Sequence, residues 1–135
     1  MSHPFDESYF SSGAYADVTY ARFSQYWWSN RYYARLVHRY GPHSGKVLEV
    51  GCGLGHLLGW LSPAYQVFGT DINLWALSQA RRNVLQGSFI IADAQDLGFF
   101  SDGTFQIVIA KHVVEHLSKP ESALAEMSRV LAPGG

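Results

Sequence analysis

The chain has 135 residues, and 47% of them are hydrophobic, which is enough to bury one sizeable core. Its formal net charge is only -1, with both signs dispersed, so neither a nucleic-acid-binding stripe nor a polybasic membrane patch is present. The single cysteine, Cys52, excludes an internal disulfide and fits a reducing compartment. Because no stretch has the length and apolarity of a membrane span or a secretory signal, we expect a cytoplasmic protein.

Residues 1–43 are rich in aromatic side chains. Proline and glycine are absent between residues 17 and 39, which predicts one or two helices there, with the rings packed on the core. Tyr9, Phe10 and Tyr15 flank a Ser-Ser-Gly sequence that predicts a loop, and they are candidates for a lid over a binding site. We therefore expect residues 1–43 to form an aromatic-rich helical cap or lid.

From residue 44 onward, short apolar runs alternate with helical patterns. Strands are expected at about 46–50, 66–70, 88–92 and 105–110. Helices are expected at about 55–61, 73–84 and 120–131. Asn73 suits the N-cap of the second helix, and Pro120 suits the first position of the third. Since the strands are almost entirely apolar, the pattern predicts a parallel sheet covered by helices on both faces.

The first predicted strand runs into a glycine-rich turn. The turn reads Glu49-x-Gly51-x-Gly53-x-Gly55, an acid followed by three glycines at alternate positions. A strand, a tight glycine turn and a helix N-terminus allow backbone N–H groups to approach a small polar ligand. The dinucleotide-binding fingerprint places its third glycine where this chain has His56. The spacing therefore disfavours a nicotinamide-dependent oxidoreductase.

Polar side chains also follow the other predicted strands: Asp71, Asp93 and Lys111. In an open parallel sheet, ligands bind beyond the carboxyl ends of the strands, so these side chains are expected to converge there. Asp71 lies 20 residues after Gly51. Nucleotide-binding sites of this kind have an acidic residue at about this distance, whose carboxylate binds both hydroxyls of a ribose. Nicotinamide dinucleotides and S-adenosylmethionine both contain such a ribose, so this acid does not separate them.

Several segments, in this order, resemble the class I S-adenosylmethionine-dependent methyltransferases, in the broad branch that acts on small molecules. They are the motif at 49–55 and the segments 69–73, 92–94, 105–110 with 112–117, and 129–135. The resemblance implies an α/β, Rossmann-like sandwich of three layers, of which this chain holds the first four strands in the order 3-2-1-4. It also implies that residues 44–135 are a partial S-adenosylmethionine-binding domain without its C-terminal strands. A missing C-terminal segment or a second copy of the chain would then cover the edge of the fourth strand.

The resemblance further assigns residues to the cofactor S-adenosylmethionine and its product S-adenosylhomocysteine. It places Glu49 at the charged methionine end, Asp71 at the ribose, Ile72 on the adenine face, and Asp93 with Ala94 at the adenine edge. The residues expected at the cofactor are Glu49, Gly51, Cys52, Gly53, Gly55, Asp71, Ile72, Asp93, Ala94 and Lys111. The expected reaction is methyl transfer to O, N or C of a small-molecule acceptor. A binding module without turnover is the alternative, followed by a nicotinamide-dependent oxidoreductase.

His112 and His116 are the candidates for a general base, because they follow the fourth strand beside the expected site. Alternatively, His112 shapes the cofactor pocket and His116 packs or caps the turn. The same stretch spells H-x-x-E-H, a zinc-protease signature that requires one helix carrying both histidines. Pro120 leaves room for barely one helical turn, so we expect no metal site. Cys52 has no identifiable basic partner for thiol catalysis.

Overall fold

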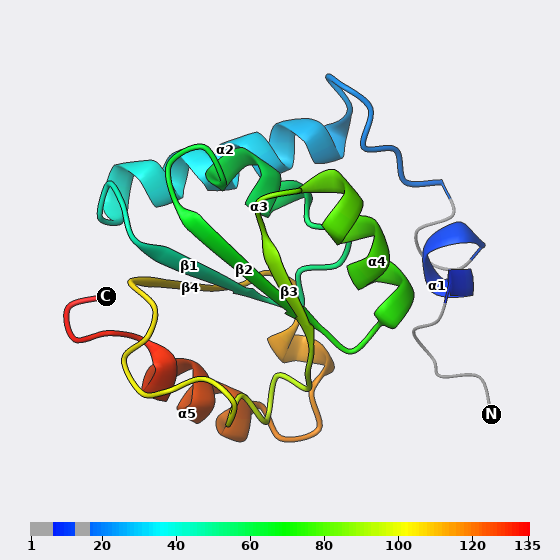
Figure 1. The fold of residues 1–135 in the computed structure, drawn as a ribbon. Helices are drawn as coiled ribbons and strands as arrows, with labels where there is room; N and C mark the ends of the chain where they lie inside the picture. The colour runs from blue at the N-terminus through cyan, green and yellow to red at the C-terminus, as the bar shows by residue number, and fades with distance from the viewer. Residues whose placement is uncertain (1–6, 13–16) are drawn as a thin grey trace.

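The computed structural model describes residues 7–12 and 17–135 (Figure 1). In this part of the chain four strands form one parallel sheet in the order β3-β2-β1-β4. The strands are β1 (Lys46–Val50), β2 (Gln66–Asp71), β3 (Ser88–Ile91) and β4 (Ile107–Ala110). The helices are α1 (Glu7–Ser11), α2 (Gln25–Tyr40), α3 (His56–Leu61), α4 (Leu74–Asn83), α5 (Pro120–Val130) and the 3-10 helix η1 (Val114–His116). This arrangement confirms the predicted Rossmann-like α/β fold and strand order.

Helices cover both faces of the sheet, as Figure 1 shows, with α2, α3 and α4 on one face and α5 on the other. Val47 and Val67 pack with Leu61 of α3 and Ala34 of α2 in one core cluster. A second cluster on the opposite face includes Phe105, which is fully buried. Burying a side chain of this kind contributes roughly 1.5–3 kcal/mol, so these two layers hold the sheet rigid beneath its strand ends. A division of the chain near residue 43 stays a prediction.

The register of the sheet aligns the carboxyl ends of its strands. Val50 pairs with Thr70 on one side and with Ala110 on the other, and Thr70 pairs with Ile90. The residues that follow these positions, Gly51, Asp71, Ile91 and Lys111, therefore emerge at the same edge of the sheet. Parallel pairing explains why residues far apart in the sequence meet there.

The predicted helix over 17–39 is wrong at its N-terminal end. Residues 17–24 form turns and bends, and α2 begins only after Ser24, whose hydroxyl accepts a hydrogen bond from the Trp27 N–H at 3.2 Å. Phe23 adopts φ 69°, a left-handed conformation that no helix continues. The absence of glycine and proline favours a helix from residue 17, but the N-cap at Ser24 makes the helix begin at Gln25.

The loop predicted around Tyr9 and Phe10 is also corrected. Both residues lie on the short helix α1, and Phe10 packs against the ring of Trp75, with 5.7 Å between ring centroids. Tyr15 lies outside the described residues. Aromatic packing against α4 therefore holds the segment that the Ser-Ser-Gly sequence suggested would be a loop.

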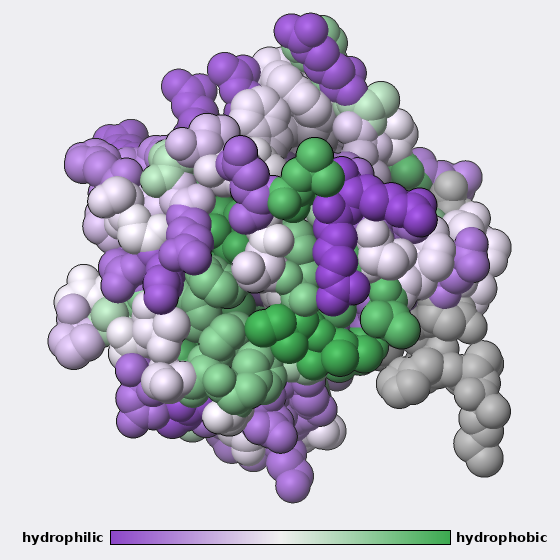
Figure 2. All heavy atoms as spheres, viewed as in Figure 1, coloured by the Kyte–Doolittle hydropathy of each residue, from purple (hydrophilic) through white to green (hydrophobic). Residues whose placement is uncertain are grey.

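The two edges of the sheet are β3 and β4. Ile91 at the end of β3 is 55% exposed, and Figure 2 shows hydrophobic side chains gathered in the middle of the face that contains β3. The residues of β4 are only half-buried, as expected for an edge strand. None of the helices in the described ranges has the length and apolarity needed to cross a membrane.

Candidate functional site

The turn between β1 and α3 uses its three glycines in left-handed conformations. Gly51, Gly53 and Gly55 have φ values of 71°, 51° and 78°, which L side chains rarely adopt. The N–H groups of Gly51 and Cys52 both donate to the carbonyl oxygen of Thr70, at 2.8 and 2.9 Å. This pair of bonds fixes the turn against the end of β2.

The three glycines differ in what an added side chain would meet. A Cβ on Gly51 would clash with Val113, and a Cβ on Gly55 would lie 3.1 Å from the Cβ of Ala80 on α4. A Cβ on Gly53 would meet only the Phe10 ring, at 3.9 Å. Gly51 and Gly55 are therefore required by packing, whereas Gly53 keeps the backbone open toward the space in front of the turn.

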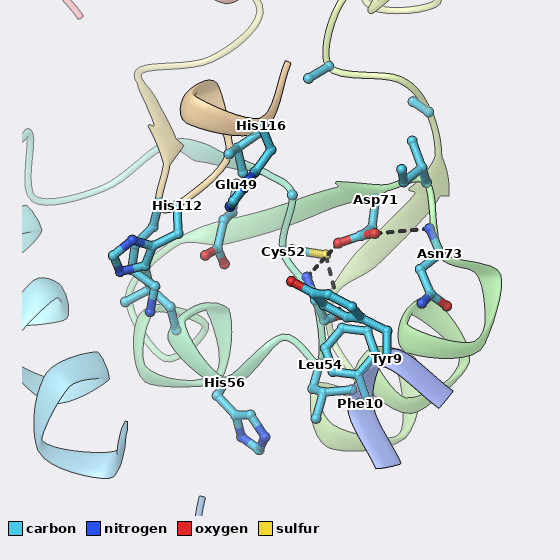
Figure 3. Close-up of a pocket in the computed structure, with 18 of the residues that line it drawn as sticks. Tyr9, Phe10, Glu49, Cys52, Leu54, His56, Asp71, Asn73, His112 and His116 are labelled. Atoms are coloured by element: carbon cyan, nitrogen blue, oxygen red, sulfur yellow. Dashed lines mark hydrogen bonds between the residues drawn. The ribbon is translucent and has the colours of Figure 1, made fainter. Parts of the chain in front are cut away.

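Asp71 ties this turn to the end of β2. One carboxylate oxygen accepts from the N–H of Gly53 at 2.8 Å and the other accepts from the N–H of Asn73 at 2.9 Å (Figure 3). Burial raises the pKa of Asp71, and the backbone hydrogen bonds oppose this rise. A carboxylate has about four lone-pair sites, so Asp71 retains capacity for further donors after these two bonds.

Glu49 in β1 is the most unusual group of the site. It is 3% exposed, and its Oε2 atom has no hydrogen-bond partner among the residues that the structure describes. Burial raises the pKa of Glu49 to about 8, although the nearby Lys111 charge opposes this rise. Figure 3 shows the Glu49 and Asp71 carboxylates facing the same opening. A buried carboxyl oxygen left unpaired costs about 1–3 kcal/mol or more, and a hydrogen-bond donor on a ligand in this cavity would offset that cost.

Lys111 follows β4 and reaches back to α2. Its ammonium group donates to the side-chain oxygen of Asn30 at 2.7 Å and lies 5.2 Å from the centroid of the Tyr33 ring. Burial lowers the pKa of Lys111, and the charge of Glu49 opposes this effect. Asn30 is 3% exposed and was not expected at the site from the sequence. The only signal for it was a lone asparagine within a strongly aromatic helix.

These groups surround a cavity of about 410 Å³, within the usual range of small-molecule sites. The expected site residues among its lining are Glu49, Gly51, Cys52, Gly53, Asp71, Ile72, Asp93, Ala94, Lys111, His112 and His116. Gly55 lies outside the lining, where it packs against α4. The further lining residues that sequence reasoning missed include Tyr20, Tyr26, Ser29, Asn30, His56 and Gln95.

Cys52 and Asp93 stand in different environments within the lining. Cys52 is 7% exposed, and burial raises the pKa of its thiol, so the thiol stays protonated at neutral pH. Asp93 instead accepts from the backbone N–H of Gln95 at 2.8 Å and from its side-chain amide at 3.1 Å. Cys52 thus acts as a packing residue of the turn, whereas Asp93 fixes the loop after β3.

Aromatic side chains form one wall of the cavity. His56 begins α3 and stacks on the ring of Tyr20, with 4.1 Å between centroids and 17° between planes. Burial lowers the pKa of His56, which keeps this imidazole neutral. Tyr20 in turn contacts Tyr26 of α2, with 5.4 Å between ring centroids. The segment before α2 is thereby held against the glycine turn.

His112 and His116 also line the cavity. His112 has φ 56°, a strained conformation for a residue other than glycine. Its Nδ1 atom lies 3.5 Å from the Glu115 carboxylate, and its side chain is 67% exposed. His116 ends the three-residue helix η1, so the H-x-x-E-H letters fall on a turn rather than on one continuous helix. The described residues contain no group of three His, Cys, Asp or Glu side chains arranged to hold a metal ion.

Comparison with known proteins identifies the family of this site. A family model described as a methyltransferase domain matches residues 48–135, which include all four strands except the start of β1. The chain belongs to the class I S-adenosylmethionine-dependent methyltransferases. Its cofactor is therefore S-adenosylmethionine, and the product of that cofactor is S-adenosylhomocysteine.

Individual relatives agree with this assignment. The phthiotriol/phenolphthiotriol dimycocerosates methyltransferase 1 of Mycobacterium ulcerans is 40% identical over 119 residues, covering 78% of this chain and 42% of that protein. The ubiquinone biosynthesis O-methyltransferase of Thiobacillus denitrificans is 32% identical over 107 residues, covering 75% and 46%. A TehB-like SAM-dependent methyltransferase from Corynebacterium glutamicum has a TM-score of 0.68 at 25% identity, covering 82% and 66%. The chain thus spans about half the length of the curated relatives it matches.

The residues present in this methyltransferase domain fit the cofactor. The unpaired Oε2 atom of Glu49 supplies a buried carboxyl oxygen that a donor group of the ligand can satisfy. Gly53 leaves its backbone open, as a closely approaching ligand requires. Asp71 retains acceptor capacity for hydroxyl donors, and both carboxylates face one cavity.

Proposed function

We propose that the chain binds S-adenosylmethionine in this cavity and takes part in methyl transfer to a small-molecule acceptor. The observation that carries the proposal is the convergence of Glu49, the open Gly53 backbone and Asp71 on one cavity. In this arrangement Glu49 holds the charged amino-acid end, Asp71 holds the ribose hydroxyls, and Asp93 with Ala94 lies at the adenine. When bound, the cofactor supplies an electrophilic methyl group carried by a sulfonium.

The protein's own contribution is to orient the acceptor and to exclude water. Aligning two reactants in this way accounts for much of the rate of such a transfer. The aromatic wall of Tyr20, Tyr26 and His56 supports an acceptor with a flat or apolar body, because the faces of neutral aromatic rings offer little to an anionic one. The nucleophilic atom of the acceptor is O, N or C.

His112 is the proposed proton acceptor when the nucleophile is a neutral hydroxyl or a protonated amine. Its Nδ1 atom lies 3.5 Å from the Glu115 carboxylate, which holds the ring at the mouth of the cavity. His116, which also lines the cavity, is the second candidate for this role. The exposed position of His112 at the opening supports contact with an acceptor that enters from solvent.

Calorimetric titration with S-adenosylhomocysteine and, separately, with NAD tests the cofactor assignment. We expect saturable binding of the first and none of the second; NAD binding would favour an oxidoreductase. Transfer of a radiolabelled methyl group to a panel of hydroxyl, amine and carbon acceptors then separates an enzyme from a binding module. Binding without transfer to any member of the panel would favour the module.

A further inference from the structure

Positive charge is concentrated on α2, although the chain as a whole is nearly neutral. Residues 18–70 hold five of the ten lysines and arginines but only one of the eleven aspartates and glutamates, the buried Glu49. The cations on α2 or just before it are Arg22, Arg31, Arg35 and Arg39. The salt bridges found in the described part of the chain include none of these four. Because they are spaced along a helix, no run of adjacent basic residues marks them in the sequence.

On the exposed side of α2, two of these cations share one stripe with large aromatic rings. The α2 stripe consists of Trp28, Tyr32, Arg35 and Arg39. Its members are three or four residues apart, so they lie on one face of the helix. Trp28 is 48% exposed and Tyr32 is 59% exposed, whereas Ala34 on the other side of the helix is buried in the core. The stripe therefore presents aromatic and cationic groups together to the outside.

The rings at the N-terminal end of the α2 stripe are held in place. Trp28 packs edge-on against Trp27, with 4.7 Å between ring centroids, and the Arg31 guanidinium lies 5.4 Å from the centroid of Trp28. Phe23 lies 6.1 Å from Trp28 between ring centroids, and Arg22 lies over the Phe23 ring at 4.7 Å. These exposed rings are thus fixed before a partner arrives, so their binding loses little side-chain entropy.

Arginines and exposed aromatic rings match a surface with phosphate groups on the outside and hydrocarbon beneath. Trp and Tyr concentrate at the headgroup level of bilayers, because their rings are amphipathic. Arginine binds phosphate through two parallel N–H donors, and basic residues are attracted to anionic lipids. Nucleic acid is the other anionic partner, but a stacked base needs a free ring face. Arg22 and Arg31 already lie over the rings of Phe23 and Trp28, so lipid headgroups fit this surface better.

We propose that the α2 stripe docks the chain on the surface of a membrane that contains anionic phospholipids. The helix lies along that surface, with the Trp28 and Tyr32 rings at headgroup level and the guanidinium groups of Arg35 and Arg39 on lipid phosphates. Figure 1 shows α2 and α5 on opposite faces of the sheet, so α5 faces away from the lipid.

The same helix contributes to the cavity from its inner side. Tyr26, Ser29 and Asn30 of α2 belong to the cavity lining. Docking through the outer side therefore brings the cavity close to a bilayer, where an acceptor with an apolar body would be concentrated. This consequence rests on the proposed function, whereas the docking itself does not.

Sedimentation with lipid vesicles tests the docking. Vesicles of phosphatidylcholine alone and vesicles of phosphatidylcholine mixed with phosphatidylglycerol differ in surface charge. The wild-type chain is compared with the double variant Arg35→Gln/Arg39→Gln. The matched control is Arg82→Gln/Lys119→Gln, which removes the same charge from exposed positions on α4 and just before α5.

The wild-type chain should bind the anionic vesicles more tightly than the neutral ones, and added salt should weaken this binding because it screens charge. Arg35→Gln/Arg39→Gln should weaken it roughly tenfold to thirtyfold, since each basic residue near an anionic surface adds about fivefold. The control should stay within about threefold of the wild-type chain, because its charges lie away from the lipid. Brominated lipid should quench tryptophan fluorescence in the wild-type chain and less so in Trp28→Phe, which keeps an apolar ring.

Three results would overturn the proposal. The first is equal binding of the wild-type chain to both kinds of vesicle, or equal affinity of Arg35→Gln/Arg39→Gln and its control. The second is the same quenching in Trp28→Phe as in the wild-type chain. The third is binding to a single-stranded RNA without binding to vesicles, which would assign the α2 stripe to nucleic acid. Circular dichroism shows whether each variant is folded. Vesicle binding needs no cofactor, so its failure would leave the proposed function intact.

Discussion

Replacing Glu49 with glutamine should make the chain more stable at alkaline pH. The ordinary pKa of this carboxyl is 4.5, and burial raises it to about 8 in the folded chain. Between these values the folded state keeps the proton while the unfolded state has lost it, so the free energy of unfolding falls as the pH rises. At 1.36 kcal/mol per pKa unit, the full effect is at most roughly 5 kcal/mol at pH 8 and above. Glutamine resembles the protonated acid in shape and does not ionise, so Glu49→Gln should remove this loss.

Urea unfolding of the wild-type chain and Glu49→Gln between pH 5 and pH 9 measures the effect. We expect the two curves to agree near pH 5 and to separate by about 2–5 kcal/mol near pH 9, with the variant more stable. Glu126→Gln serves as a control of opposite sign, because the Arg129 hydrogen bond lowers the pKa of Glu126 and its ionised form is stabilising. A Glu49→Gln variant that is less stable than the wild-type chain at pH 9 would refute a destabilising buried charge. The same variant should bind S-adenosylhomocysteine more weakly, since glutamine replaces one carboxyl oxygen with an NH2 group that cannot accept a hydrogen bond from the ligand.

Four further substitutions separate packing from binding and turnover. Gly53→Ala should lower the free energy of unfolding by only about 1–2 kcal/mol, because alanine is strained at the left-handed φ of this position. It should nevertheless weaken the binding of S-adenosylhomocysteine at least about tenfold. Gly55→Ala should lower the free energy of unfolding further, because its Cβ would also press on α4. Chemical unfolding with calorimetry compares the two, and equal affinity of Gly53→Ala and wild type would mean that no ligand approaches this turn. Asp71→Asn should weaken S-adenosylhomocysteine by roughly tenfold to a hundredfold by calorimetry and also lower the melting temperature, because Asp71 accepts backbone hydrogen bonds as well. His112→Asn should lower kcat and flatten the pH–rate profile without changing the affinity for S-adenosylhomocysteine; a retained profile would transfer the proton-acceptor role to His116.

The parts of the site that local sequence patterns specify were predictable. Glu49, Asp71 and Lys111 each stand at or beside the end of an apolar run, and parallel pairing brings such ends together regardless of their separation in the sequence. The glycine turn was equally evident, because its positive φ values require glycine. The fold and the position of the cavity follow from these two regularities.

The N-terminal part of the site could not be derived in the same way. Asn30 meets Lys111 across 81 positions of sequence, and no periodicity in either segment indicates that contact. The positive φ of Phe23 and the stacking of Tyr20 on His56 also depend on tertiary packing rather than on local preference. An aromatic-rich segment predicts burial, but the identity of the surface that buries it comes only from the folded structure.

The central claim is that the carboxyl ends of β1 and β2 hold S-adenosylmethionine between Glu49 and Asp71. A crystal structure of the chain grown with saturating S-adenosylhomocysteine tests it most directly. We predict that the ribose hydroxyls lie within hydrogen-bond distance of the Asp71 carboxylate and the amino-acid end lies beside Glu49. Density for the ligand at any other place on the chain, or a cavity without ligand at saturation, would contradict the account.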